Sequence, residues 1–204
     1  MRTVRVLTIA DLHSPLSKAE GEALHEANSD CDVCFLLGDI PITELCIIKE
    51  QVKLPMCGVL GNHDIHNMLE YEQIPDCGFR TFDIAGLKVA GFPGSPKYKN
   101  DRHHVMFTQE EASSLSAELI ASTDRIDVLL SHSAPYDKQA DVAHSGFKAI
   151  DKFLDKHHPS VMLHGHDHVS KQSDYRSLSL LLHGRTHIPV IGTFRVEKHE
   201  LQIR

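Results

Sequence analysis

The stretch Gly58-Val59-Leu60-Gly61-Asn62-His63-Asp64 joins an apolar run to a polar tip. Apolar residues bounded by turn signals are typical of a buried strand, which we expect over Met56 to Leu60. Packing does not require the tip, whose side chains offer an amide oxygen, an imidazole and a carboxylate. In open α/β sheets, ligands bind outside the carboxyl ends of the strands. We therefore expect Asn62, His63 and Asp64 at a functional edge of a sheet.

Other apolar runs end in the same kind of residue. One such strand end carries little information, because Gly-Asp occurs in many turns and a single His is usually a satisfied polar group. Gathered at one edge without a metal, however, so many Asp and His side chains would place unpaired charge in a buried setting, which is costly. The set predicts two adjacent metal sites that share a carboxylate. Its members are Asp11 and His13, Asp39, Asn62 and His63, His132, and His164 and His166.

Length, charge and cysteine content narrow the class of protein. The 204 residues suit one domain over 1–204 with a sizeable core. The formal net charge of −7 argues against long nucleic acid as the main partner, because such binding depends on Lys and Arg neutralising phosphates. The five cysteines are an odd number, so we expect reduced, structural thiols. Strand-like sequence begins at once and no apolar run approaches roughly 18 residues, so we expect no signal peptide, no membrane span and a cytoplasmic location.

The first half of the chain reads as β-α-β-α-β, which favours a parallel sheet with right-handed crossovers. We expect strands over Thr3 to Ala10, Val33 to Leu37 and Met56 to Leu60. Ser17 and Glu20 form a capping box for the first helix, and Thr43 caps a short second helix that ends at Val52.

The second half changes to an alternating pattern and then returns to helices and strands. A hairpin is expected over Phe79 to Ile84 and Leu87 to Phe92, followed by a loop over 93–102 that is either plain solvated chain or a substrate rim. A second capping box, Thr108 with Glu111, begins a helix to about Ser122. The remaining expected elements are a strand over Asp127 to Leu130, a helix from Gly146 to about His157, and strands over Val161 to Leu163, Leu178 to Leu182, Ile188 to Val196 and Leu201 to Ile203, the last two joined near Lys198.

The order of these ligands resembles that of the calcineurin-like metallophosphoesterases, most closely their small, capless members. The matching residues are Asp11-x-His13, Gly38-Asp39, Gly61-Asn62-His63-Asp64, His132, and Gly165 flanked by His164 and His166. This resemblance spans nearly the whole chain. It implies an α/β fold, a four-layer α/β/β/α sandwich with mixed β-sheets.

The resemblance also implies a pair of divalent ions bridged by Asp39. One ion would be bound by Asp11, His13, Asp39 and His166, and the other by Asp39, Asn62, His132 and His164. Two neighbouring ions acidify a shared water and clamp a phosphoryl group for in-line attack. Oxygen and nitrogen ligands without a thiolate suit Mn, with Fe or Zn as alternatives. His63 is implied to stabilise the transition state or to protonate the leaving oxygen, and Asp64 to orient the His63 imidazole.

The resulting hypothesis is a dinuclear metal-dependent phosphodiesterase that hydrolyses a small soluble phosphoester through a metal-bridging hydroxide. Asn62, His63, Lys97 and Arg185 are the expected substrate contacts, and His144 and His168 are weaker candidates for the lining of the site. The chain continues Gly38-Asp39 with Ile40-Pro41, where many family phosphatases have a further Asp and a Gly or Arg, so protein-phosphatase activity is not expected. The alternatives are a non-catalytic protein-binding scaffold of the same fold, a phosphomonoesterase and a nuclease.

Overall fold

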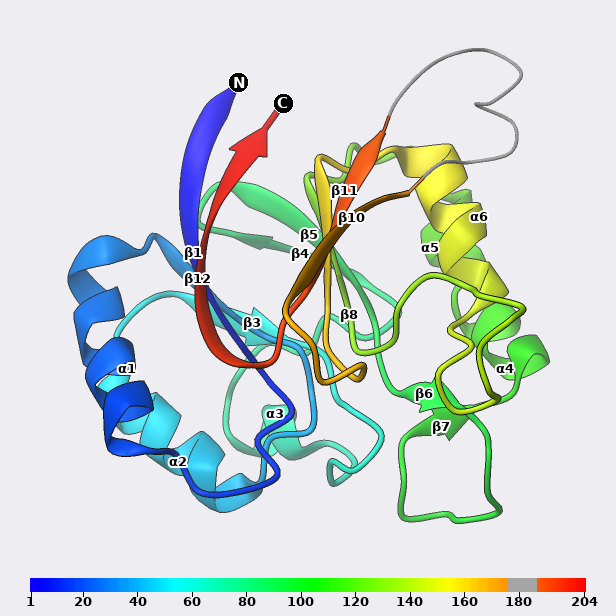
Figure 1. Ribbon diagram of the computed structural model, residues 1–204. Helices are drawn as coiled ribbons and strands as arrows, with labels where there is room; N and C mark the ends of the chain where they lie inside the picture. Colours follow the sequence, from blue (N-terminus) through cyan, green and yellow to red (C-terminus); the bar gives the residue numbers. More distant parts are fainter. Residues whose placement is uncertain (176–186) are drawn as a thin grey trace.

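The computed structural model describes residues 1–175 and 187–204, which form two principal β-sheets and a short strand pair (Figure 1). The first sheet has the order β12-β1-β2-β3, with β1 (Arg2–Ala10), β2 (Val33–Leu36), β3 (Met56–Gly58) and β12 (Arg195–Ile203). The second has the order β10-β11-β9-β8-β5-β4, with β4 (Thr81–Ile84), β5 (Leu87–Phe92), β8 (Val128–Ser131), β9 (Val161–His164), β10 (Lys171–Tyr175) and β11 (Ile188–Gly192). The short pair is β6 (Ser95–Pro96) and β7 (Met106–Phe107).

Both sheets are mixed. In the first, β1, β2 and β3 are parallel and β12 runs antiparallel to β1. In the second, β5, β8, β9 and β11 are parallel, and the edge strands β4 and β10 are antiparallel to their neighbours. The carboxyl ends of the parallel strands carry the predicted ligands, as expected for an open α/β sheet.

Helices cover the outer face of each sheet (Figure 1). They are α1 (Lys18–Asp30), α2 (Ile42–Gln51), α3 (Met68–Tyr71), α4 (Gln109–Leu115), α5 (Ala117–Ala121) and α6 (Lys148–His157). The first sheet packs against α1 and α2, and the second against α4, α5 and α6. No helix within residues 1–175 and 187–204 has the length and apolar character needed to cross a bilayer.

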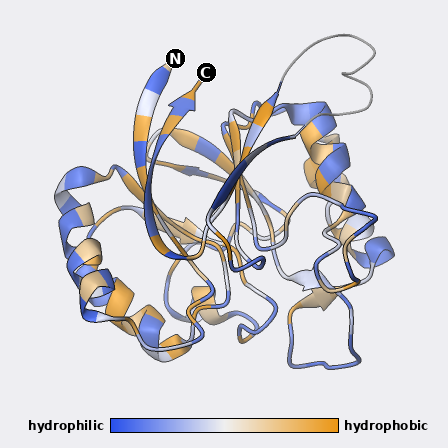
Figure 2. Cartoon of the chain, viewed as in Figure 1, coloured by the Kyte–Doolittle hydropathy of each residue, from blue (hydrophilic) through white to orange (hydrophobic). Residues whose placement is uncertain are grey.

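Three apolar cores hold these layers together. Val6, Phe35 and Leu130 lie in the core between the two sheets. Leu7, next to Val6, points to the opposite face and packs in the core beneath α1 and α2, as the two-residue period of a strand requires. Figure 2 shows apolar residues along the central strands and polar residues on the outer faces of the helices. The predicted four-layer α/β/β/α sandwich is confirmed.

The helix starts follow the local sequence closely. Ser17 accepts from the Glu20 amide while the Glu20 carboxylate accepts from the Ser17 amide, so the first capping box is confirmed, and the Thr108–Glu111 box is confirmed in the same way. The predicted cap at Thr43 is wrong, because the N-cap position is two residues earlier, at Pro41, whose φ of −55° already suits a helix start.

The helix predicted to run to Ser122 is divided in two. The break lies at Ser116, where the hydroxyl donates to the Ala112 carbonyl at 2.7 Å and ends α4 before α5 begins. Back-bonding of this kind competes with regular helix geometry.

The end of the chain differs most from the sequence prediction. β11 ends at Gly192, and the chain crosses to the other sheet at Thr193 and Phe194, so the predicted turn near Lys198 is wrong. Lys198 lies in mid-strand, opposite Leu7, in a register that extends over the whole of β1. β10 was not predicted, because its side chains are almost all exposed and give no apolar signal. The predicted strand over Leu178 to Leu182 lies outside the described residues.

Candidate metal centre

Ligand side chains from both sheets converge beyond the carboxyl ends of their strands. Asp11 follows β1, Asp39 follows β2, His132 follows β8, and His168 lies four residues beyond β9. Two overlapping groups bring their ligand atoms within 4.8 Å of one another: Asp11, His13 and His168, and Asp11, Asp39 and His132.

The first group surrounds a buried carboxylate oxygen. Asp11 is fully buried, and its Oδ2 accepts from the His166 amide at 2.9 Å, whereas its Oδ1 has no hydrogen-bond partner among the described residues. The Nε2 atoms of His13 and His168 lie 2.9 Å apart, and His168 Nε2 is 3.9 Å from Asp11 Oδ1. Burial and the charge of Asp39 raise the pKa of Asp11 to about 8. A cation is the group that would satisfy this oxygen and its two imidazole neighbours together.

The second group is centred on His132, which is fully buried. Its Nδ1 donates to the Leu37 carbonyl at 2.8 Å, which leaves a lone pair on Nε2, and burial lowers the pKa of the ring so that it stays neutral. That lone pair faces Asn62 Oδ1 at 2.9 Å and Asp39 Oδ2 at 3.6 Å. Metal-ligating histidines commonly donate their other N–H to a backbone carbonyl. Three electron-rich atoms that face one another fit a bound cation.

Three histidines lie at the end of β9 and just beyond it, and they take different positions. His164 still belongs to β9, and its Nδ1 donates to the Gly165 carbonyl; it is in neither ligand group. The ring centroid of His166 lies 4.9 Å from that of His132, and its Nε2 donates to the Ala143 carbonyl, which leaves Nδ1 without a proton. His168, which the sequence ranked as a weak candidate, lies beside His13. The structure therefore places His168 in a ligand group and the His166 ring beside His132, whereas His164 remains in the strand.

The side chains of His63 and Asp64 lie in different environments, whereas the sequence analysis expected them to be in contact. His63 is exposed at the mouth of the site, its amide donates to Asp39 Oδ1 at 2.7 Å, and its ring centroid lies 6.0 Å from that of His13. Asp64 is buried and accepts from three backbone amides, those of Asp39, Ile40 and Gly61. Its carboxylate oxygens are thus engaged with the backbone, so the expected contact with the His63 imidazole is not formed. Burial and Asp39 raise the pKa of Asp64 to about 7, although these amides act against the rise.

The backbone around the site is strained and tightly packed. Asp11, Asp39, His166 and His168 all have φ between 54° and 70°, in the left-handed region. Such strain gathers at functional sites. Gly61 is needed for close approach, since a Cβ there would lie 2.2 Å from both the amide nitrogen and Oδ1 of Asp39.

The loop between β6 and β7 brings further polar groups to the site. Tyr98 Oη lies 3.5 Å from Asn62 Nδ2, and the His104 ring centroid is 5.0 Å from that of His63. His104 in turn contacts Lys99 and Asp101, at 3.0 Å and 2.9 Å. The sequence did not identify Tyr98 and His104 as site residues, because this loop has no regular period. A substrate rim was nevertheless one of the two interpretations of the loop.

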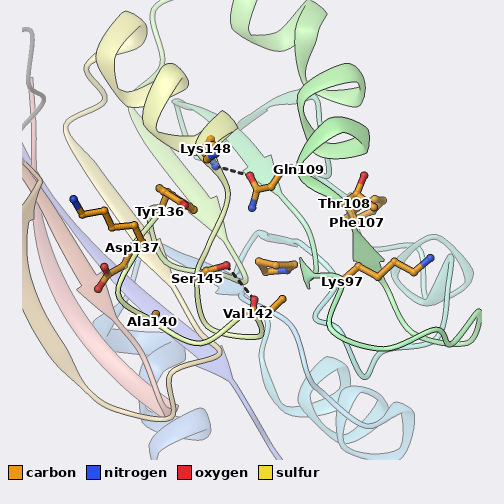
Figure 3. A pocket seen from close by; sticks show the side chains of 12 residues that line it. Lys97, Phe107, Thr108, Gln109, Tyr136, Asp137, Ala140, Val142, Ser145 and Lys148 are labelled. Carbon is orange, nitrogen blue, oxygen red and sulfur yellow. Dashed lines mark hydrogen bonds between the residues drawn. The ribbon is translucent and has the colours of Figure 1, made fainter.

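Lys97 lies elsewhere. It lines a separate cavity of about 370 Å³, together with residues such as Gln109, Tyr136 and Lys148. In Figure 3 its side chain extends away from the others that line this cavity. His144 is exposed, and its ring centroid lies 5.0 Å from that of His166. Arg185 lies outside the described residues.

Comparison with known proteins agrees with the fold. Residues 4–170 match the family described as calcineurin-like phosphoesterase. Similar solved structures include TT1561 of Thermus thermophilus, with a TM-score of 0.62, 15% identity and coverage of 97% of this chain and 99% of that one. Another is a phosphopantetheinyl hydrolase from Mycobacterium tuberculosis, with a TM-score of 0.58, 11% identity and coverage of 93% and 89%. A third is the calcineurin-like phosphoesterase YfkN from Bacillus subtilis, with a TM-score of 0.54, 15% identity and coverage of 98% and 85%. No curated protein matches the chain in sequence.

Proposed function

The chain belongs to the calcineurin-like phosphoesterase family, and we propose that it is a metal-dependent hydrolase of a small soluble phosphoester, with phosphodiesters as the main class. The observation that supports this most strongly is the convergence of His132 Nε2, Asn62 Oδ1 and Asp39 Oδ2 next to the unpartnered Asp11 Oδ1. So many acceptors without donors are an unfavourable arrangement in a buried site unless cations are bound.

We assign one ion to Asp11, His13, Asp39 and His168, and a second to Asp39, Asn62, His132 and His166. This set replaces His164 of the sequence prediction with His168 and moves His166 to the second ion. The donor set of carboxylate, amide and imidazole suits Mn, with Fe or Zn as alternatives. When bound, such a pair supplies an acidified water and neutralises charge on the phosphoryl group.

The remaining polar groups of the site either position the metal ligands or transfer a proton to the substrate. His63 lies at the exposed edge of the site with its amide held by Asp39, so its imidazole can deliver a proton to the leaving oxygen. Asp64 fixes the backbone on either side of Asp39 and thus acts as a positioning residue. Tyr98 and His104 lie where they would contact the ester from the β6–β7 side.

The test is hydrolysis of bis-p-nitrophenyl phosphate by metal-stripped protein with and without Mn²⁺. We expect turnover only with Mn²⁺, loss of turnover in Asp39→Asn, and a rate loss of about 10²-fold or more with unchanged metal content in His63→Gln. His66→Gln is the matched control, because His66 is also exposed and lies three residues further along the same loop.

Full activity of the stripped protein would overturn the proposal. Tight Mn²⁺ binding with no turnover of any diester or monoester would instead favour the protein-binding scaffold. p-Nitrophenyl phosphate and single-stranded DNA, assayed in parallel, distinguish a phosphomonoesterase and a nuclease from the proposed diesterase.

A further inference from the structure

A cleft of about 430 Å³ opens directly beside the candidate metal centre. His13, Asp39 and His63 line it on the side of the ligands, so it is continuous with the place where a phosphoryl group would bind. A substrate bound at the ions can therefore extend one of its ester groups into this cleft.

Apart from Asp64, the rest of the cleft is apolar. Ile42, the first residue of α2, and Ile65, in the loop before α3, line it with 37% and 60% of their surfaces exposed, and Met68 of α3 is buried behind them. Single exposed apolar residues are common on protein surfaces. These two differ because they lie in one cleft together with the catalytic imidazole.

The polar groups of the cleft do not fit an anion. Among the residues that the structure describes, no Lys or Arg lines it. The amides of Asp39 and Ile40 already donate to Asp64, at 2.9 and 2.8 Å, and are not free to bind a phosphate. The cleft thus disfavours the polyphosphate or second phosphate of a nucleotide-like substrate.

We propose that this cleft binds the apolar organic group of the substrate, an alkyl or aryl ester group, while the phosphoryl group lies over the metal ligands. This inference rests on the proposed function and specifies its substrate class: phosphoesters with at least one apolar, uncharged ester group. Ile42 and Ile65 are the residues that determine this specificity.

The test compares binding of pentylphosphonate and methylphosphonate, which share a headgroup and cannot be hydrolysed at the carbon–phosphorus bond. Isothermal titration of the full chain with Mn²⁺ bound should give about tenfold tighter binding of the pentyl compound, because roughly half of its added apolar surface would be buried. Ile42→Ser and Ile65→Ser should each reduce this preference to about threefold or less.

Ile47→Ser is the matched control. Ile47 lies on the same helix as Ile42 and is 38% exposed, but it does not line the cleft. This variant should retain the tenfold preference. A native preference below about twofold, or an equal loss in Ile47→Ser and Ile42→Ser, overturns the inference.

The two proposals fail in different ways. Hydrolysis of bis-p-nitrophenyl phosphate without any preference for the longer phosphonate overturns the cleft assignment and leaves the proposed function standing. A clear preference for the longer phosphonate in a protein that hydrolyses no phosphoester supports the apolar cleft and overturns the proposed function.

Discussion

Replacing Asp64 with Asn tests whether this carboxylate holds the backbone or orients His63. In the structure, Asp64 Oδ2 accepts from the Asp39 and Gly61 amides at 2.9 and 2.7 Å, and Oδ1 accepts from Ile40 at 2.8 Å. The single oxygen of Asn can keep two of these bonds, but its NH₂ group would then face the third N–H. One charge-assisted bond is lost, which costs about 1.5–3 kcal/mol. Relief of the buried charge next to Asp39 offsets part of this, so the free energy of unfolding should fall by about 2 kcal/mol.

The assay is urea unfolding of the metal-free protein at pH 8, followed by circular dichroism, with Mn²⁺ affinity measured separately. A loss of about 2 kcal/mol corresponds to roughly 4–8 °C in melting temperature for a chain of this size. Asp83→Asn, whose side chain is 75% exposed in a surface pair with Lys88, should change stability by less than about 1 kcal/mol. Native-like stability in Asp64→Asn, combined with a shifted pH–rate profile, would refute this reasoning and restore the sequence prediction that Asp64 orients His63.

Three other perturbations give separate outcomes. His168→Asn should lower the bound Mn²⁺ from two ions to about one per chain, whereas His164→Asn should leave both, as measured by metal analysis; the reverse result would restore His164 as a ligand. Gly61→Ala should abolish turnover of bis-p-nitrophenyl phosphate, because its Cβ would displace the Asp39 carboxylate. Hydrogen bonding to Arg195 lowers the pKa of Glu20 from 4.5 to about 2, so the pair stabilises the fold above pH 4.5 and stops doing so as pH falls through 2. Glu20→Gln should therefore cost roughly 1–2 kcal/mol at pH 7, discounted for partial exposure, and nothing near pH 2 in urea titrations at each pH.

The sequence predicted the strands well where burial gives a continuous apolar signal. Val33 to Leu36 is buried throughout, and so is Val128 to Ser131, and both were predicted to within a residue or two. β10 gave no such signal, because Lys171 to Tyr175 is almost entirely exposed. The break at Ser116 depends on a side-chain hydrogen bond that residue periodicity does not report.

The ligands at the end of β9 were harder to predict from sequence than the strands, and the reason is geometric. His164, His166 and His168 alternate along the chain, so an extended strand would place all three on one side. Sequence spacing cannot decide which of the three turn toward the other candidate ligands. In the structure, His164 stays in the strand, whereas His166 and His168 have φ of 70° and 54°, and these two left-handed residues redirect the chain. Backbone reversals of this kind depend on the surrounding packing, which the histidines themselves do not encode.

The same left-handed geometry links the fold to the chemistry. Asp11 and Asp39 also have positive φ, each immediately or shortly after a buried strand, and each such residue costs about 1 kcal/mol or more. That cost is sustained because the strands before them are fixed in cores on both faces, with Val6 packed between the sheets and Leu7 beneath the helices. The ligands are therefore held close together without an ion, and a bound cation would relieve the repulsion between their acceptors. A protein arranged in this way should gain stability from the metal and bind it with little movement, because rigid strands rather than loops set the positions of its carboxylates.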